Sequence, residues 1–465
     1  MNGGEAGRNV SGRRRLLLLP LLALAVLGAP ATALAHPLGN FTINTSASLV
    51  LRADEVIVDY AIDMAEIPTF QERRTIDADG DGSLSSAETA AYRGDACAGV
   101  EGGLHLKVDG TPARLAVRSS DLSLPVGQAG LRTLRLVCNF GTAVAPGATH
   151  ALMFEDANYP DRLGWHEVTA AGDGATIVRS DVPSASPSLR LRSYPKNVRP
   201  SNVRAATIAF EPGGAPLRDA FAGGTSTQAS GGLLAGLASR PDLSAGLVAL
   251  MIAAAIAVGA VHAFGPGHGK SLIGAYLVGS GGTLRQAVAV GGAVSVMHTA
   301  SVLGLGLLVL SAERLFAPER VYPWLGLASG LVALGLGAAL LVSRLHALSE
   351  RRRHGHEHPH PARPLSRPGL ITLAFAGGIL PSPSALVVLL GSVSIGRTGL
   401  GLVLIAAFSL GLAASLIAVG AVALRARDMA TGRLPARLMR LAPVVSAGCI
   451  ALAGVALTAR GLFQI

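Results

Sequence analysis

Six apolar segments of membrane-spanning length occupy the second half of the chain and restrict its fold more than any other feature. An α-helix of about 20 apolar residues crosses a lipid bilayer. Segments of this kind lie at residues 243–264, 285–310, 322–343, 370–391, 399–424 and 441–463. The sequence therefore predicts an α-helical polytopic membrane protein with six spans over residues 243–465.

The N-terminus has the pattern of a secretory signal peptide. Three consecutive arginines at 13–15 precede an apolar run, and the small-residue sequence Ala-Leu-Ala at 33–35 follows it. We expect cleavage before His36, so that residues 1–35 are removed and the chain that follows is exported.

Residues 36–212 show the short alternating apolar patterns that predict β-strands, with turn residues between them. The predicted strands are Phe41–Leu51, Val56–Ile62, Leu104–Val108, Leu131–Phe140 and Ala206–Phe210. We interpret the segment as a β-sandwich-like exported domain with a small helical insertion. Its two cysteines, Cys97 and Cys138, form a candidate disulfide in an oxidising compartment. The Gly-, Ala- and Ser-rich residues 213–242 are a predicted linker.

The formal net charge of +10 belongs to the apolar half of the chain. Residues 36–242 hold 18 Lys/Arg against 23 Asp/Glu, whereas residues 243–465 hold 17 against 5. The predicted cytosolic loops 344–368 and 425–440 carry eleven arginines and the predicted outer loops three, which is the positive-inside pattern for an exported N-terminal domain. We therefore expect a multi-pass plasma-membrane protein in the lipid bilayer, with an extracytoplasmic N-terminal domain and no nucleic-acid partner.

One acidic segment of the exported domain matches the calcium loop of an EF-hand. Residues 77–88 read Asp-Ala-Asp-Gly-Asp-Gly-Ser-Leu-Ser-Ser-Ala-Glu, with side-chain oxygens at loop positions 1, 3, 5, 9 and 12 and glycine at position 6. The candidate calcium ligands are Asp77, Asp79, Asp81, Ser83, Ser85 and Glu88. Because exported loops of this type bind calcium weakly, we expect a structural Ca²⁺ ion rather than a signalling one.

Three histidines in the apolar half form a second candidate metal site. His262 and His268 flank a Gly-Pro-Gly sequence, and His298 lies in the next predicted span. The Gly-Pro-Gly sequence breaks the helix, so both flanking imidazoles can turn toward one site with His298. Imidazole is a ligand for nickel and cobalt, whereas calcium and magnesium prefer oxygen. The residues expected to support this site are Gly265, Pro266, Gly267, Lys270, Pro381 and Pro383.

The two helix breaks also indicate an internal repeat. The Gly-Pro-Gly sequence at 265–267 and the Pro-Ser-Pro sequence at 381–383 lie near the starts of two three-span halves. Halves of three spans insert with opposite orientation, which predicts a 3+3 inverted repeat with broken helices at the substrate site. The short apolar segment 271–279 after the first break is a candidate re-entrant half-helix.

Carboxylates are absent from the predicted spans, because the five acidic residues after 243 all lie in predicted loops. Any proton coupling would therefore run through histidine, with Lys270 as a positive charge that replaces the ion. The cytosolic loop 344–368 is rich in His and Arg, a composition suited to loose metal capture or to a plain solvated linker. The candidate capture residues are His354, His356, His358 and His360.

Two segments resemble enzyme motifs in sequence but lack the features that those motifs require. Gly265 to Ser271 resembles a phosphate-binding loop, but the required glycine position is Phe264 and an apolar helix precedes it. Residues 356–360 fit the letters of a zinc-protease motif, but Pro359 prevents the helix that would stack the two histidines. We therefore expect no enzyme activity.

The membrane half resembles the NicO-type nickel/cobalt transporters. The resemblance rests on His262-Ala-Phe-Gly-Pro-Gly-His268-Gly-Lys270, on the sequence Ser-Val-Met-His-Thr-Ala-Ser at 295–301 and on the sequence around Pro381 and Pro383. Ser382 stands where the family often has cysteine, which removes a possible soft ligand. The N-terminal domain is similar to an extension found on a subset of these transporters. The resemblance implies transport of nickel or cobalt ions, Ni²⁺ or Co²⁺, as substrate.

Other functions remain as alternatives to this interpretation. A membrane-anchored calcium-binding or sensory protein would use the exported domain as its functional part, but one span suffices for an anchor. Transmembrane thiol electron transfer requires paired membrane cysteines, and only Cys449 lies in the spans. We expect proton-coupled export of the metal ion, because the His-rich tract lies on the predicted cytosolic side and protons compete with metal for imidazole.

Overall fold

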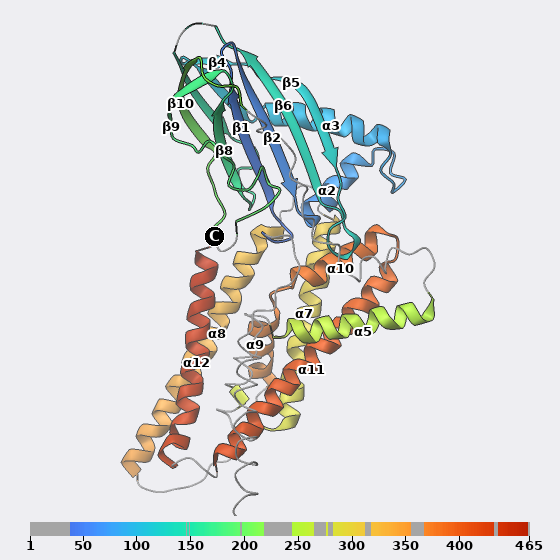
Figure 1. Cartoon of the computed structure of the whole chain (residues 1–465). Helices are drawn as coiled ribbons and strands as arrows, with labels where there is room; N and C mark the ends of the chain where they lie inside the picture. The colour runs from blue at the N-terminus through green and yellow to red at the C-terminus, as the bar shows by residue number, and fades with distance from the viewer. Residues whose placement is uncertain are drawn as a thin grey trace, which may run out of the picture.

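The chain folds into a sheet-rich N-terminal domain that sits on one end of a helical membrane domain (Figure 1). This computed structural model describes residues 38–145, 147, 149–195, 198–217, 244–264, 276–277, 282–311, 318–354, 367–431 and 436–463. The predicted signal peptide, nearly all of the linker, the first helix break and most of the His-rich tract lie outside these residues. The predictions for them therefore stay predictions.

Ten strands of the N-terminal domain form two five-stranded sheets. The strands are β1 (Ile43–Leu51), β2 (Glu55–Met64), β3 (Leu104–Val108), β4 (Thr111–Ala113), β5 (Ala116–Ser123), β6 (Leu134–Ala143), β7 (His150–Asp156), β8 (His166–Gly172), β9 (Ala175–Ser180) and β10 (Ala205–Pro212). The first sheet has the order β5-β6-β2-β1-β8 and the second the order β4-β3-β7-β10-β9. Among the paired strands of the described residues, β1 and β8 run parallel and the other pairs antiparallel. The predicted N-terminal sheet domain is thus confirmed.

One apolar core lies between the two sheets. It includes the fully buried side chains Tyr60, Phe140 and Phe210 from β2, β6 and β10. The other face of the first sheet is covered by the segment after β9, where hydroxyl and indole donors surround the buried Glu167 carboxylate. Ser46, Trp165 and Ser188 donate to Glu167 at 2.7–2.9 Å. Every residue of β1 is buried.

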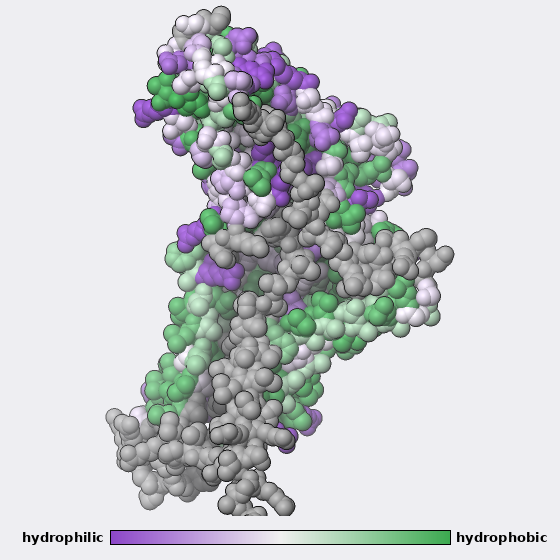
Figure 2. Space-filling model, viewed as in Figure 1, coloured by the Kyte–Doolittle hydropathy of each residue, from purple (hydrophilic) through white to green (hydrophobic). Residues whose placement is uncertain are grey.

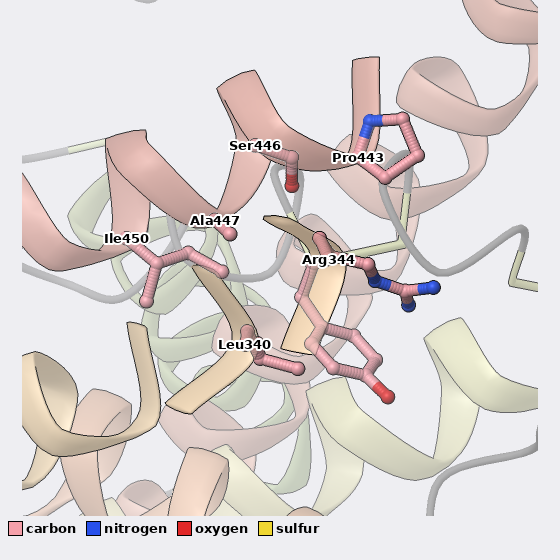
Figure 3. Close-up of a pocket in the computed structure, with 7 residues that line it drawn as sticks. Leu340, Arg344, Pro443, Ser446, Ala447 and Ile450 are labelled. Carbon is pink, nitrogen blue, oxygen red and sulfur yellow. The ribbon is translucent and has the colours of Figure 1, made fainter. Parts of the chain in front are cut away.

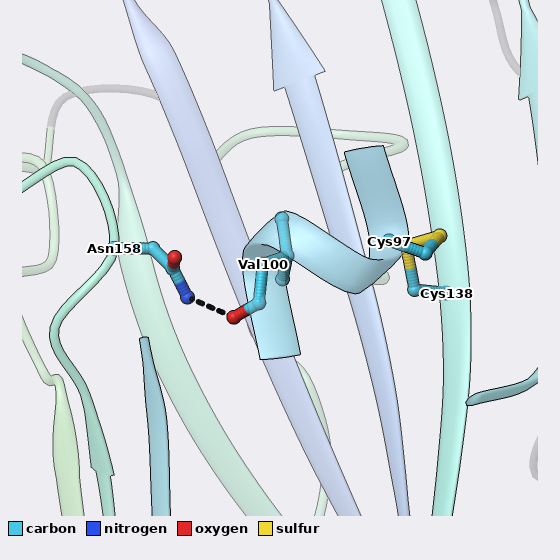
Figure 4. The surroundings of a disulfide bond; sticks show 4 residues. All are labelled: Cys97, Val100, Cys138 and Asn158. Carbon is cyan, nitrogen blue, oxygen red and sulfur yellow. Dashed lines mark hydrogen bonds between the residues drawn. A yellow bond between two sulfur atoms is a disulfide. The ribbon is translucent and has the colours of Figure 1, made fainter. Parts of the chain in front are cut away.

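A helical insertion follows β2. Helix α2 (Glu66–Ile76) and helix α3 (Ser86–Glu101) enclose the acidic loop, and Ser85 caps α3 in a reciprocal capping box with Glu88. Figure 4 shows how α3 is fixed to the first sheet, where a disulfide joins Cys97 to Cys138 with their Cα atoms 5.7 Å apart. Nearby, Asn158 donates to the Val100 carbonyl at 3.1 Å.

The described membrane helices match the predicted polytopic fold. They are α5 (Ala245–His262), α7 (Leu284–Ser311), α8 (Pro318–His354), α9 (Arg367–Gly378), α10 (Pro383–Ser394), α11 (Thr398–Thr431) and α12 (Ala436–Leu462). Five helices among the described residues are long and apolar enough to cross a membrane, and a sixth span results if α9 and α10 are one. Figure 2 shows apolar residues over their outer surface, whereas the N-terminal domain carries most of the polar surface.

The fourth predicted span is not a straight helix. Helices α9 and α10 meet at a break of four residues and are bent by 75°. Pro383 is the first residue of α10, where its missing N–H costs nothing, and the Ser382 hydroxyl accepts from the Ala385 N–H at 3.1 Å. The Pro-Ser-Pro sequence thus ends one helix and starts the next.

Two predicted cytosolic loops begin as helix. Helix α8 continues through residues 344–354 and α11 through 425–431, beyond the apolar windows that set the predicted boundaries. The cytosolic connections between the spans stay a prediction, and their first residues are helical. Arginine, alanine and glutamate favour helix strongly, so a helix does not end where its apolar window ends.

A buried polar network lies between β1, β2, β7 and β8. Tyr60 and Thr45 donate to one Asp156 carboxylate oxygen at 2.8 and 3.1 Å, and Thr45 Oγ1 lies 2.9 Å from His166 Nδ1. Burial, assisted by the charge of Arg204, lowers the pKa of His166 from 6.5 to about 4. The imidazole is therefore neutral in the folded domain at neutral pH.

Acidification between pH 6.5 and about pH 4 is expected to destabilise the N-terminal domain. Because the folded pKa of His166 lies below the unfolded value, the unfolded state binds the extra proton in this window, and stability is lost as the pH falls. The loss amounts to ~3 kcal/mol. Denaturant unfolding followed by Trp165 fluorescence, in a chain with Trp324→Phe, measures it. His166→Gln should flatten this pH dependence, and an equally steep dependence in that variant contradicts the assignment.

Candidate functional site: a histidine pair beside a broken span

Two histidines from different membrane helices lie next to each other. His262 is the last residue of α5, and His298 lies in the middle of α7, where only 2% of it is exposed. Their ring centroids are 5.9 Å apart. A tertiary contact thus joins two of the three histidines that the sequence singled out, while His268 lies outside the described residues.

A phenylalanine from a third helix completes the cluster. Phe408 of α11 is buried, and its ring centroid lies 5.3 Å from that of His262 and 6.3 Å from that of His298. The Phe408 and His298 rings are nearly parallel, with 20° between their planes. Phe408 therefore forms an apolar wall against both imidazoles. No pattern in the sequence pointed to Phe408, because an aromatic residue in an apolar span has the composition of ordinary packing.

Glycines allow α5 and α11 to touch backbone to backbone at this cluster. A Cβ atom added to Gly259 would lie 2.0 Å from the Phe408 carbonyl oxygen, and one added to Gly411 would lie 1.9 Å from the Ile256 carbonyl oxygen. Neither position tolerates any side chain. Ser415 of α11 also donates to the Ala260 carbonyl of α5 at 3.1 Å. This close approach fixes His262 relative to Phe408, as small residues do at many membrane-helix contacts.

The broken span reaches His298 from the other side. A Cβ atom added to Gly378, the last residue of α9, would lie 2.5 Å from the Val294 carbonyl oxygen and 3.2 Å from the His298 nitrogen. Ser301 of α7 donates to the Gly378 carbonyl at 3.4 Å. The end of α9, immediately before the Pro-Ser-Pro break, therefore lies against the backbone of His298.

The spacing of the two imidazoles suits a shared metal ion. An imidazole nitrogen binds a borderline divalent ion at about 2.1 Å, so the ring centroid lies about 3.2 Å from the ion. Two rings on one ion then have centroids at most about 6.4 Å apart. The observed 5.9 Å lies within this limit.

The residues predicted to support the site fall into two sets. Pro381 lies within the break between α9, which ends at Gly378, and α10, and Pro383 is the first residue of α10. Gly265, Pro266, Gly267, His268 and Lys270 lie outside the described residues, as do His356, His358 and His360 of the tract. His354 is described only as the last residue of α8.

A small pocket elsewhere in the membrane domain has the wrong chemistry for a cation. It lies between α8 and α12 and is lined by Tyr276, Leu340, Arg344, Pro443, Ser446, Ala447 and Ile450. Figure 3 shows the Arg344 side chain beside Pro443. Because this lining offers a guanidinium and no carboxylate, thiol or imidazole, it repels a divalent cation.

The acidic loop of the N-terminal domain gathers its carboxylates at one point. One oxygen each from Asp77, Asp79 and Asp81 lies within 4.8 Å of the others. The Glu88 carboxylate accepts from the backbone of Ser85, Ala78 and Asp79, and these hydrogen bonds, chiefly those from Ser85, lower the pKa of Glu88 to about 2. The loop therefore presents four carboxylates between α2 and α3.

The described helices define a polytopic membrane protein, and the comparisons with known proteins identify its class as transport protein. The NicO family, described as high-affinity nickel-transport protein, matches residues 248–371. MJ1092 of Methanocaldococcus jannaschii, named for nickel/cobalt efflux, is 31% identical over 201 residues, which cover 43% of this chain and 88% of that relative. The nickel/cobalt efflux system RcnA of Citrobacter koseri is 27% identical, over 46% of this chain and 94% of that relative.

The chain therefore belongs to the NicO family, which confirms the resemblance of its membrane half. It is a transport protein and not an enzyme. No solved structure matches it. The matched residues include both His262 and His298 but none of the N-terminal domain.

Proposed function

We propose that this chain exports nickel or cobalt ions and that His262 and His298 form the core of its transport site. The proposal is carried by one observation, the two imidazoles 5.9 Å apart, with the end of α9 in the broken span against the backbone of His298. Imidazole nitrogen suits these borderline ions. His268 is proposed as a third ligand, and carbonyls freed by the helix breaks, supported by Gly265, Pro266, Gly267, Pro381 and Pro383, as further ligands.

We further propose that protons drive the export. Imidazole binds a metal ion only when it is deprotonated, so a proton entering from the acidic side releases the ion. Lys270 is proposed to supply positive charge when the site is empty. His354, His356, His358 and His360 would gather ions on the side from which transport starts. This direction is supported by the relatives, which are named efflux systems.

The histidine site is tested by substitution. His262→Ala and His298→Ala should each lower nickel and cobalt transport at least tenfold, because each removes one ligand from the shared ion, while insertion stays intact because alanine is cheaper in the membrane than imidazole. Uptake of radioactive nickel into everted membrane vesicles provides the measurement. His346→Ala, on the exposed cytosolic part of α8, is the control. Full transport by the double variant His262→Ala/His298→Ala rules this site out.

Direction and coupling are tested in the same vesicles. Everted vesicles should accumulate nickel when their lumen is made acidic, because the imposed gradient exchanges protons for metal, and nigericin should abolish the uptake. Removing residues 354–360 should weaken uptake at low metal concentration and leave it intact at saturation. Cells that express the chain should hold less nickel than cells that lack it. A higher cellular nickel content would reverse the proposed direction.

We also propose that Asp77, Asp79, Asp81, Ser83, Ser85 and Glu88 bind a structural Ca²⁺ ion in the exported domain. Binding to the folded state alone raises stability by mass action, so millimolar calcium should raise the unfolding temperature reported by Trp165. Glu88→Gln removes a bidentate ligand and should abolish the shift, whereas Glu101→Gln, at the far end of α3, should not. An equal shift in Glu88→Gln would refute the site.

A membrane-anchored calcium sensor is the less favoured alternative. Such a protein needs one span, whereas the described chain has five or six candidate spans with imidazoles inside the bundle. Loss of transport on histidine substitution, with calcium binding retained, separates the two functions.

A further inference from the structure

The N-terminal domain is joined to the membrane domain by a shared apolar cluster. Ile67 of α2 and Leu131, which follows the short helix η1 (Gln128–Gly130), pack with residues of α7 and α10. The membrane members of the cluster are Leu305, Val309, Leu386, Val387 and Leu390. Ile67 is fully buried there, although it lies on the outside of its own domain's core. The contact therefore removes apolar surface of both domains from water.

Hydrogen bonds fix the part of this contact that belongs to the N-terminal domain. The buried Glu66 carboxylate accepts from the Gln128 N–H at 2.9 Å and from the Asn40 amide at 3.1 Å. These bonds tie the first turn of α2 to η1. The two elements that touch α10 thus form one rigid surface.

Arginine 73 provides a polar contact at the far end of α10. Arg73 Nη1 donates to the Ser394 carbonyl at 3.4 Å, and Arg73 Nη2 donates to the Gly82 carbonyl of the acidic loop. Ser394 is the last residue of α10, where unpaired carbonyls carry the negative end of the helix dipole. A cation at this position stabilises the helix end.

Helix α10 connects the N-terminal domain to the proposed transport site. It begins at Pro383, directly after the break, and α9 on the other side of the break ends at Gly378 against the His298 backbone. A shift of α10 must therefore be absorbed within the four residues of the break or passed on to Gly378 and His298.

We propose that the N-terminal domain positions the broken span, and that Ile67 and Arg73 are positioning residues for the histidine site. The N-terminal domain contacts α10 and so limits its movement. Because α10 is joined through the break to α9, this contact also helps to fix Gly378 against the His298 backbone. This inference rests on the proposed function only for its transport readout, because the docking itself is measurable without metal.

The experiment uses the full chain with Ile67→Asp, which introduces a charge into the apolar cluster, and Arg73→Gln, which removes the contact to Ser394. Amide hydrogen exchange over residues 383–394 measures how firmly α10 is held, Trp165 fluorescence reports folding of the N-terminal domain, and everted vesicles report nickel uptake. Val178→Asp, on the exposed face of β9, and Arg93→Gln, on the exposed side of α3, are matched controls.

Faster exchange in 383–394 is expected for both variants, with an unfolding temperature of the N-terminal domain within a few degrees of the parent chain. Ile67→Asp should lower the maximal uptake rate about tenfold and also change the KM for nickel, and Arg73→Gln should lower the rate about threefold, with partial rescue by Arg73→Lys. Both controls should behave like the parent chain.

Unchanged exchange in both variants overturns the docking contact. Faster exchange with unchanged uptake and KM overturns the positioning role. If the parent chain itself takes up no nickel or cobalt, the proposed function fails, while the exchange data still decide whether the N-terminal domain holds α10.

Discussion

Backbone contact between α5 and α11 is the constraint on which the histidine site depends. The carbonyl oxygens of Phe408 and Ile256 occupy the space that side chains at Gly259 and Gly411 would need. Within a bilayer no hydrophobic force drives helices together, so close packing and interhelical hydrogen bonds must do so. The Ser415 bond to α5 and the Ser295 bond from α7 to the Ser409 carbonyl, at 2.6 Å, provide such contacts around the cluster.

The same site depends on an interruption of regular helix. Free backbone groups are tolerated at membrane depth only where protein surrounds them. At the break between α9 and α10, Ser382 is almost fully buried and satisfies a backbone donor of α10 with its hydroxyl. The serine hydroxyl at 382 therefore caps the first turn of α10. The break places a helix end beside His298 without exposing its polar groups to lipid.

The N-terminal domain contacts the membrane domain at the end that the predicted topology places on the extracytoplasmic side. Ile67 and Leu131 pack against the end of α7 and one face of α10. Phe41 packs against Tyr322 near the start of α8, with ring centroids 5.0 Å apart and the ring planes tilted by 55°. An exposed ion pair between Asp161 and Arg320 lies at 2.8 Å. Among these contacts the buried ones dominate, because exposed ion pairs contribute little.

The amino-acid sequence alone determined the class of the protein and pointed to several residues of the candidate site. Apolar segments of spanning length predicted the membrane helices, the Pro-Ser-Pro sequence predicted the broken span, and the rarity of imidazole in such segments singled out His262 and His298. These features are local, since each depends on the composition or order of a short stretch. The acidic sequence at 77–88, whose first three carboxylates the fold gathers at one point, is a local feature of the same kind.

Only the tertiary structure decided what lies around those residues. Phe408 is separated from His262 by more than one hundred residues of sequence, and its role arises from the glycine contact of α5 with α11. Likewise, no local pattern links Ile67 with Leu386 or Arg73 with Ser394. Helix packing brings these groups together because shape and missing side chains, rather than composition, determine which surfaces can approach closely.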